Sequence, residues 1–271
     1  MEKEKPIGVF DSGIGGLTVV KRIASYLPQE DIVYFGDTAR VPYGSKSNDT
    51  IIDYGLQDAK FLMHKNIKAL VVACNTVSSI ALDQLKSRFD IPIIGMIDPG
   101  ARMASLHSKN KKIGVIGTRS TISNQAYSKK IKRNDPSLYV FERACPLFVP
   151  LAEEGWTKHK ATYEIAEEYL LEFGKIGIDT LVLGCTHYPI LAEVIQYVVG
   201  KDVKLIDSGI AAAESVKEEL ERYNLLTNKF AIGNQSFFVS DIPMKFKELA
   251  ELFLGRPISE VQKIDVESLT G

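Results

Sequence analysis

Cysteine is scarce in this sequence, with three among 271 residues, and no two of them stand in a CxxC pair. A disulfide framework is therefore excluded, and a reducing compartment is favoured. Neither sign of charge dominates, since 33 Lys and Arg face 34 Asp and Glu, which argues against nucleic acid or a membrane surface as the main partner. No apolar run approaches the ~20 residues that cross a bilayer. The first ten residues, MEKEKPIGVF, lack the apolar region of an export signal, so we expect a cytoplasmic protein.

Strand-like and helix-like segments alternate along the whole chain. Most of the strand candidates are continuous Val, Ile and Leu runs, as expected for parallel strands that helices cover on both faces. They span residues 7–10, 31–37, 69–75, 91–97, 112–118, 138–143, 179–185 and 203–209. This alternation predicts an α/β fold with mainly parallel sheets.

The chain is longer than the usual domain of ~100–150 residues, which favours two lobes. IGVFDSGIGG at the start and IGVIGTRST at 113–121 each begin a stretch that continues to an apolar strand ending in cysteine, a weak sign of two similar halves. The DPG at 98–100 interrupts the pattern and is a plausible boundary. From the residues alone, the segment after 207 could complete either lobe.

The segment DSGIGGLT, residues 11–18, follows the first strand and begins a helix. Its glycines allow a tight turn whose N–H groups can face an anion. Thr18 stands where a dinucleotide-binding turn has its third small residue, so a nicotinamide cofactor is not indicated. The turn has two readings: Asp11 or Ser12 caps the helix, or the turn holds a small carboxylate while Asp11 has a polar catalytic or ammonium-binding role.

Two further segments supply candidates. The loop RVPYGSKS, residues 40–47, follows a strand at the edge where parallel sheets bind ligands, which makes Tyr43 and Gly44 binding candidates. In VPLAEEGW, Glu153 and Glu154 could form a solvated helix start or bring a carboxylate to a cysteine.

Cys74 in VVACNTVSS and Cys185 in LVLGCTHYP share one context, the end of an apolar strand followed by polar residues. A thiol there lies beside a helix N-terminus, which favours the thiolate. The alternative is a buried, inert cysteine, as we expect for Cys145. His187 could satisfy a backbone group or tune Cys185.

Three kinds of site compete for these residues. Zinc needs three or four ligands, and without CxxC or HxxxH pairs we expect no metal. A Cys–His nucleophile is possible because His187 is two residues from Cys185, but it leaves Cys74 without a role. Two thiols from two lobes suit a racemase, which removes a proton from one face of a carbon and returns it from the other. Such a pair holds one thiol and one thiolate, so its titrations are coupled.

The segments FDSGIGGLTV, YFGDTARVPYGSKS, VVACNTVSS, ACPLFVPL and LVLGCTHYP together resemble the cofactor-independent glutamate racemases of bacteria, in the same order over nearly the whole chain. The resemblance implies interconversion of L- and D-glutamate without pyridoxal phosphate or metal, supplying D-glutamate for peptidoglycan. It also implies two α/β lobes, residues 1–98 with 208–271 and residues 99–207, with the active site in the cleft between them. A homodimer is a further implication.

The same resemblance assigns roles to particular residues. Cys74 and Cys185 would be the paired acid/base groups, assisted by Asp11 and His187. One of Glu153 and Glu154 would join them, and Glu153 is taken as the candidate. The substrate-binding residues would be Asp11, Ser12, Tyr43, Gly44, Asn75, Thr76, Thr186 and His187.

Other functions stay open at this point. They are a racemase for aspartate, a hydantoin-type relative, and a non-catalytic module that binds a small anion or amino acid. The sequence does not indicate which cysteine acts on which enantiomer, how protomers are arranged, or whether a cell-wall precursor regulates activity.

Overall fold

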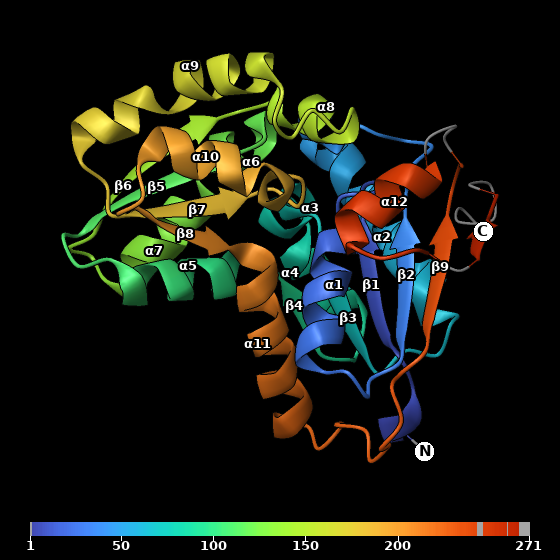
Figure 1. The fold of residues 1–271 in the computed structure, drawn as a ribbon. Coiled ribbons are helices and arrows are strands. Elements are labelled where there is room, and N and C mark those ends of the chain that lie inside the picture. Colours follow the sequence, from blue (N-terminus) through green and yellow to red (C-terminus); the bar gives the residue numbers. More distant parts are fainter. Residues whose placement is uncertain (1, 243–245, 259, 266–271) are drawn as a thin grey trace.

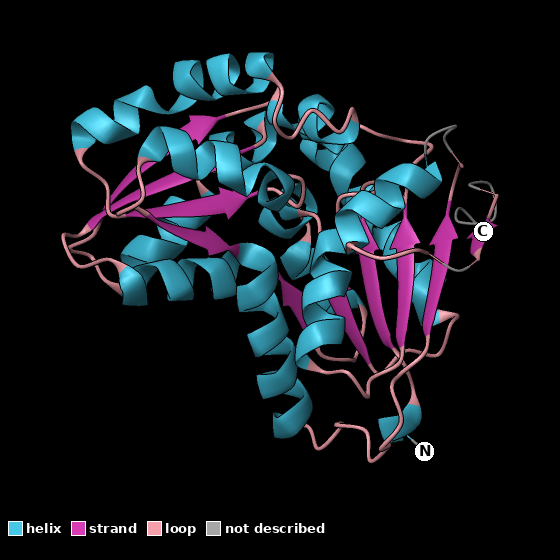
Figure 2. Ribbon diagram, viewed as in Figure 1, coloured by secondary structure: helices cyan, strands magenta, loops and turns pink. Residues whose placement is uncertain are grey.

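Two parallel β-sheets organise the protein, as the strand pattern predicted (Figures 1 and 2). The structure is a computed structural model and describes residues 2–242, 246–258 and 260–265. Every strand pairing among these residues is parallel. The fold is therefore α/β, and the prediction of two lobes with mainly parallel sheets is confirmed.

The first sheet has the strand order β10-β9-β2-β1-β3-β4. Its central strands are buried along their whole length, because helices cover both faces. Its strands are β1 (Ile7–Asp11), β2 (Ile32–Gly36), β3 (Ala69–Val72), β4 (Ile93–Gly95), β9 (Gln235–Val239) and β10 (Val261–Lys263). The chain thus returns to this sheet near its end, and β10 was not predicted from the sequence.

The second sheet has the order β6-β5-β7-β8. Its strands are β5 (Lys112–Gly117), β6 (Tyr139–Ala144), β7 (Thr180–Gly184) and β8 (Lys204–Asp207). In Figure 1 the two sheets lie on opposite sides of the molecule, and the ends of β1, β3 and β7 approach the region between them.

Helices connect the strands of each sheet. The helices up to the second sheet are α1 (Leu17–Tyr26), α2 (Asn48–Met63), α3 (Asn75–Ile80), α4 (Leu82–Arg88) and α5 (Ile97–His107). The later ones are α6 (Arg119–Ser123), α7 (Ala126–Asn134), α8 (Phe148–Glu153), α9 (Lys160–Ile176), α10 (Ala192–Val199), α11 (Ser208–Arg222) and α12 (Phe246–Leu254). Short 3-10 helices are η1 (Glu2–Glu4), η2 (Tyr43–Ser45) and η3 (Tyr188–Leu191). None of the helices in the described part of the chain is long and apolar enough to span a membrane.

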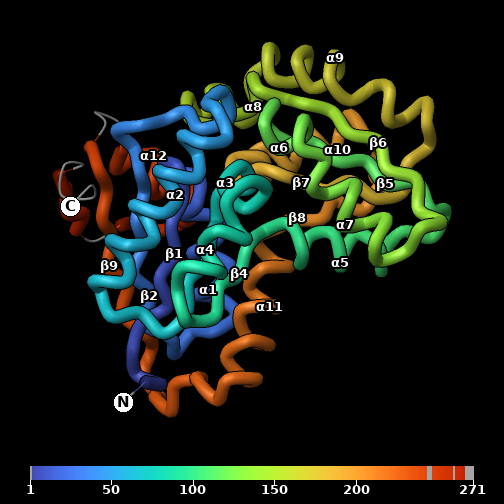
Figure 3. The backbone as a smooth tube through the Cα atoms, turned by 180° about the vertical axis from the view of Figure 1, so that it is seen from behind, coloured from blue at the N-terminus to red at the C-terminus, as the bar shows by residue number. Residues whose placement is uncertain are grey.

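The sequence predicted that Pro and Gly break the pattern at residues 98–100, but the structure places these residues inside helix α5. Pro99 and Gly100 lie in the first turn of α5, where proline loses no helical hydrogen bond. This helix packs on α7, β7 and β8, whereas α11 packs on both α5 and α1 and so joins the two lobes. Figure 3 shows α11 running along that junction from behind. The lobe limits 1–98 with 208–271 and 99–207 stay a prediction, and residues 1, 243–245, 259 and 266–271 of the first lobe lie outside the described residues.

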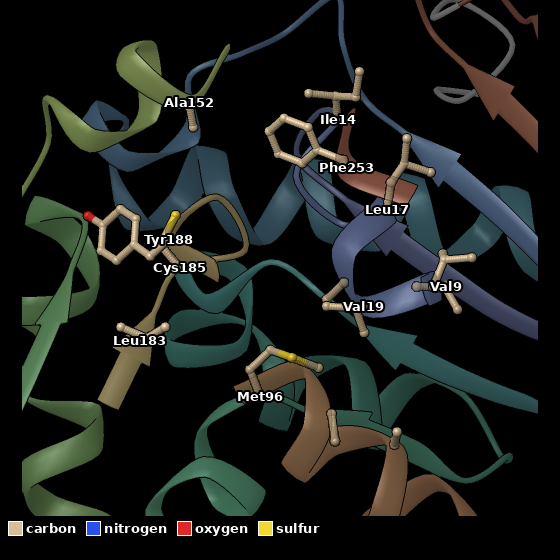
Figure 4. Packing of buried hydrophobic residues seen from close by; sticks show 14 of the residues in the cluster. Val9, Ile14, Leu17, Val19, Met96, Ala152, Leu183, Cys185, Tyr188 and Phe253 are labelled. Carbon is tan, nitrogen blue, oxygen red and sulfur yellow. The ribbon is translucent and has the colours of Figure 1, made fainter. Parts of the chain in front are cut away.

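One apolar cluster crosses from lobe to lobe. It includes Val9, Ile14 and Leu17 from the first lobe together with Leu183 and Tyr188 from the second, and Figure 4 draws part of it. Burial of apolar side chains stabilises a fold by ~25 cal/mol per Å². The position of one lobe on the other is therefore supported by packing as well as by polar contacts.

Candidate active site

A cavity of about 380 Å³ lies where strands of the two sheets end. Most of the predicted site residues line it, namely Ser12, Tyr43, Gly44, Cys74, Asn75, Thr76, Glu153, Cys185, Thr186 and His187. Residues far apart in the chain meet because the carboxyl ends of parallel strands lie at one edge of a sheet. Asp11 is not part of the wall and lies behind it, fully buried.

Cys74 is the residue before α3, two positions after the end of β3. Its thiol donates a hydrogen bond to Ser12 Oγ at 3.5 Å, and the residue is only 5 % exposed. Burial and the nearby negative charge of Asp11 raise the pKa of Cys74 to about 12. Cys74 is therefore a protonated thiol at neutral pH, and its thiolate is a strong base.

Cys185 occupies the corresponding place after β7, but its neighbours differ. Its sulfur lies 3.8 Å from His187 Nδ1, and His187 Nε2 lies 2.9 Å from a carboxylate oxygen of Glu153. Burial by itself lowers the pKa of His187, but the interactions with Cys185 and Glu153 outweigh it and raise that pKa to about 10. A charged imidazolium at this place stabilises a thiolate beside it.

The structure distinguishes the two adjacent glutamates. Glu153 is the last residue of α8 and contacts His187, whereas Glu154 is the C-cap residue of that helix. The Glu153 side chain is 39 % exposed, so water reaches the outer end of this chain of contacts.

Asp11 supports the turn that carries Ser12. One oxygen accepts a hydrogen bond from the Gly13 N–H at 3.0 Å, and the other lies 3.4 Å from Thr186 Oγ1. Burial raises the pKa of the Asp11 carboxyl, although the charge of His187 acts in the opposite direction. Asp11 therefore links the turns before α1 and after β7, and its charge acts on Cys74 and on His187.

Asn75 and Thr76 start α3 and turn polar groups toward the cavity. Asn75 Oδ1 accepts a hydrogen bond from the Tyr127 hydroxyl at 2.7 Å, while Asn75 Nδ2 is buried and has no partner in the described part of the chain. A buried donor without a partner is costly, which points to a ligand as its acceptor. Thr76 Oγ1 lies 3.0 Å from the Thr118 hydroxyl of the second lobe.

Tyr43 lines the cavity, but its hydroxyl is engaged elsewhere. It donates to Asp37 and also lies 3.2 Å from an oxygen of Asp58, and both carboxylates are held by Arg40. Tyr43 therefore contributes its ring and backbone to the wall, while the hydroxyl holds the loop. Gly44 follows it, and its carbonyl accepts a hydrogen bond from Ser120 Oγ at 2.9 Å.

Several wall residues were missed from the sequence, among them Thr118 and Arg119. Thr118 follows β5 just as Ser12 follows β1, so the faint similarity of the two glycine-containing segments was the available signal. The apolar part of the wall comes from Val41, Pro42, Pro146, Val149 and Pro150. Among the described residues, no three His, Cys, Asp or Glu side chains are grouped so as to hold a metal ion.

Comparison with known proteins points to racemases. The family model described as Asp/Glu/Hydantoin racemase matches residues 7–216. A glutamate racemase from Geobacter metallireducens is 51 % identical over 97 % of this chain and 98 % of its own length. One from Chlorobaculum parvum is 50 % identical over 96 % of both chains.

Solved structures agree. The crystal structure of a glutamate racemase from Francisella tularensis in complex with D-glutamate superposes with a TM-score of 0.92 at 41 % identity, covering 98 % of this chain and 99 % of that one. With a family match over most of its length and close relatives over nearly all of it, this chain belongs to the Asp/Glu/Hydantoin racemase family, on its glutamate racemase branch.

Proposed function

We propose that this protein interconverts L- and D-glutamate by a two-base mechanism in which Cys74 and Cys185 are the proton-transfer groups. The observation that carries the proposal is that these two thiols, one from each lobe, open into a single cavity. Two groups of one kind on opposite sides of a substrate suit removal of a proton from one face and its return to the other.

The two sulfurs have different surroundings. The raised pKa of Cys74 keeps a proton there, whereas the sulfur of Cys185 lies 3.8 Å from Nδ1 of His187, a ring whose own pKa is raised to about 10. The reaction requires one thiol and one thiolate, and an imidazolium is the neighbour that stabilises a thiolate.

The reaction balances with no other reactant. The thiolate takes the Cα proton of one enantiomer, and the electron pair of the broken C–H bond stays on the planar carbanion. The opposite thiol then donates its proton to the other face of that carbon. One proton has moved from one sulfur to the other, and turnover of the other enantiomer reverses the change.

The amino-acid substrate is held by groups around these thiols. The unpaired Asn75 Nδ2 is suited to donate to a carboxylate, and the hydroxyls of Thr76, Thr118 and Thr186 add neutral donors. Fixed donors of this kind also stabilise the charge that develops as the carbon loses its proton. Ser12, with the Asp11 carboxyl behind it, suits the substrate ammonium group.

The relatives support glutamate as the substrate, because those named are glutamate racemases and one was crystallised with D-glutamate. We propose further that the enzyme uses neither pyridoxal phosphate nor metal. We also propose that it works in the cytoplasm as a homodimer and supplies D-glutamate for peptidoglycan.

The test is to incubate purified, cofactor-free protein with L-glutamate in heavy water. Circular dichroism follows the loss of optical activity, and NMR follows deuterium at Cα. We expect the optical signal to decay to zero while deuterium enters the α-position. The absence of both changes, from protein shown to be folded, would refute the proposal.

The same assay separates the remaining alternatives. Faster exchange with L-aspartate than with L-glutamate would identify an aspartate-type enzyme. Binding of glutamate without exchange, unaffected by Cys74→Ala and Cys185→Ala, would identify a non-catalytic binding module.

A further inference from the structure

The imidazole of His187 has polar contacts at its two nitrogens and further contacts from residues of the first lobe. Glu153 lies against Nε2, and Cys185 and Thr186 lie near Nδ1. These contacts direct the two nitrogens, but the Glu153 side chain is 39 % exposed and the other two distances are long, at 3.8 and 3.5 Å. Hydrogen bonds of this quality leave the tilt of the ring weakly fixed.

Two residues of the first lobe also contact this ring. The ring of Phe253 lies with its centroid 5.4 Å from that of His187, at an interplanar angle of 83°. Gly15 also approaches the ring, because a Cβ built there would fall 2.6 Å from His187 Cε1 and Nδ1. Both lobes therefore pack against the imidazole.

Phe253 is itself rigidly held. It lies near the end of α12, is fully buried, and belongs to the apolar cluster that contains Ile14 and Leu17. Figure 4 shows its ring beside Ile14, at the turn that begins α1. Helix α12 packs on α1, so Phe253 is fixed on the same body as the glycine turn. It is absent from the cavity wall, so its effect on a bound substrate is indirect, and His187 is a wall residue that its ring contacts.

We propose that Phe253 is a positioning residue that holds the His187 ring in the orientation for proton exchange with Cys185, an inference that rests on the proposed function. An edge-to-face aromatic contact favours one tilt of the imidazole over others. Because the contact joins the two lobes, His187 is correctly oriented only when they are packed together. The last described helix of the chain thus contributes to a site whose reacting groups come from earlier segments.

The proposal is tested by removing the ring while keeping apolar volume, in Phe253→Leu and Phe253→Met. The matched control is Phe246→Leu, at an equally buried phenylalanine of the same helix. We expect both Phe253 variants to lower kcat about three- to tenfold with KM changed less than about twofold, since an aromatic pair contributes on that scale. The control should leave both constants within about twofold. Thermal unfolding verifies that each variant is folded at the assay temperature.

Two further measurements separate positioning from general support of the fold. In a His187→Gln background, Phe253→Leu should change kcat less than about twofold, because there is no imidazole left to orient. In parallel, the Cε1–H NMR signal of His187, assigned by its loss in His187→Gln, reports the titration of the ring. The groups that face this ring and affect its titration are Asp11, Glu153 and Cys185. Loosening it from Glu153 should lower its pKa in Phe253→Leu.

An equal loss of kcat in both backgrounds, or an unchanged kcat and an unchanged His187 titration in folded Phe253→Leu, overturns the inference. If His187→Gln is too slow to assay, the NMR titration alone decides. A wild-type protein that fails to exchange the α-hydrogen of glutamate overturns the proposed function instead, and the NMR titration still reports whether Phe253 fixes the ring.

Discussion

Replacing Gly15 with alanine adds a single methyl group where the first lobe lies against Thr186 and His187 of the second. The backbone at Gly15 does not have a positive φ, so alanine fits the local conformation and the cost is purely steric. The new Cβ would lie 2.3 Å from Thr186 Oγ1 and 2.6 Å from two atoms of the His187 ring, whereas ordinary contact begins at 3.4 Å. The turn and the Thr186–His187 segment must therefore separate by about 1 Å.

This displacement has two measurable consequences. Overpacking of a dense contact costs ~1–3 kcal/mol, which lowers Tm by roughly 2–12 °C for a chain of this size. A shift of about 1 Å in a catalytic group can lower the rate by ~100-fold. We therefore expect kcat for glutamate racemisation to fall far more than the loss of stability alone would cause at 25 °C.

The matched control is Gly174→Ala, at an exposed position in the last turn of α9, where a Cβ would meet nothing within 4 Å. Alanine is the better helix former by ~0.5–1 kcal/mol, so Tm should rise slightly and kcat should not change. Circular dichroism melts and the heavy-water assay measure both quantities. The reasoning is refuted if Gly15→Ala racemises glutamate at the wild-type rate, or if the two variants shift Tm in the same direction.

Three further predictions concern the cavity itself. Cys74→Ser and Cys185→Ser should each lower kcat in both directions by ~100-fold or more in the racemisation assay while leaving the thermal melt intact, and near-normal turnover in either would contradict a two-base mechanism. Asn75→Ala should raise KM by about tenfold or more through loss of a hydrogen bond to a charged group, and an unchanged KM in steady-state kinetics would remove Asn75 from the binding site. Glu153→Gln should move the alkaline limb of the kcat/KM profile to lower pH. The raised pKa of His187 preserves the imidazolium until the pH reaches about 10, and without Glu153 that charge is lost earlier, so an unmoved limb would contradict this role.

Much of the site follows from sequence because parallel sheets place strand ends together. Continuous apolar runs ended at Cys74 and Cys185. The polar residues after each cysteine indicated the carboxyl edge of each sheet. The DSGIGG turn was predicted from its glycines, and Gly15 does approach the other lobe more closely than any side chain would allow. The local spacing of apolar and polar residues predicts where strands and helices begin and end. The edge of the sheet at which the cavity lies follows from those positions, so a sequence predicts it directly.

What the sequence could not supply was the direction of individual side chains. Tyr43 was a candidate for contact with a ligand, yet its hydroxyl turns to Asp37 and Asp58, which come from other elements. Glu153 and Glu154 are adjacent residues of one type, and only the fold shows that Glu153 contacts His187 at the end of α8. Each outcome depends on packing between segments far apart in the chain, which a local pattern cannot specify.

The same packing explains why two identical residues have unlike surroundings. Burial and the charge of Asp11 raise the pKa of Cys74. Cys185 instead lies against the ring of His187, whose Nε2 contacts Glu153 and whose pKa is raised. The L and D forms of an amino acid have equal free energies, so kcat/KM for the two directions must be equal whatever the enzyme provides. The chemical difference between the two sides of the cavity can therefore appear only as parallel differences in kcat and KM. Unequal neighbours thus change kcat and KM of the two enantiomers by the same factor, while the equilibrium between them is unchanged.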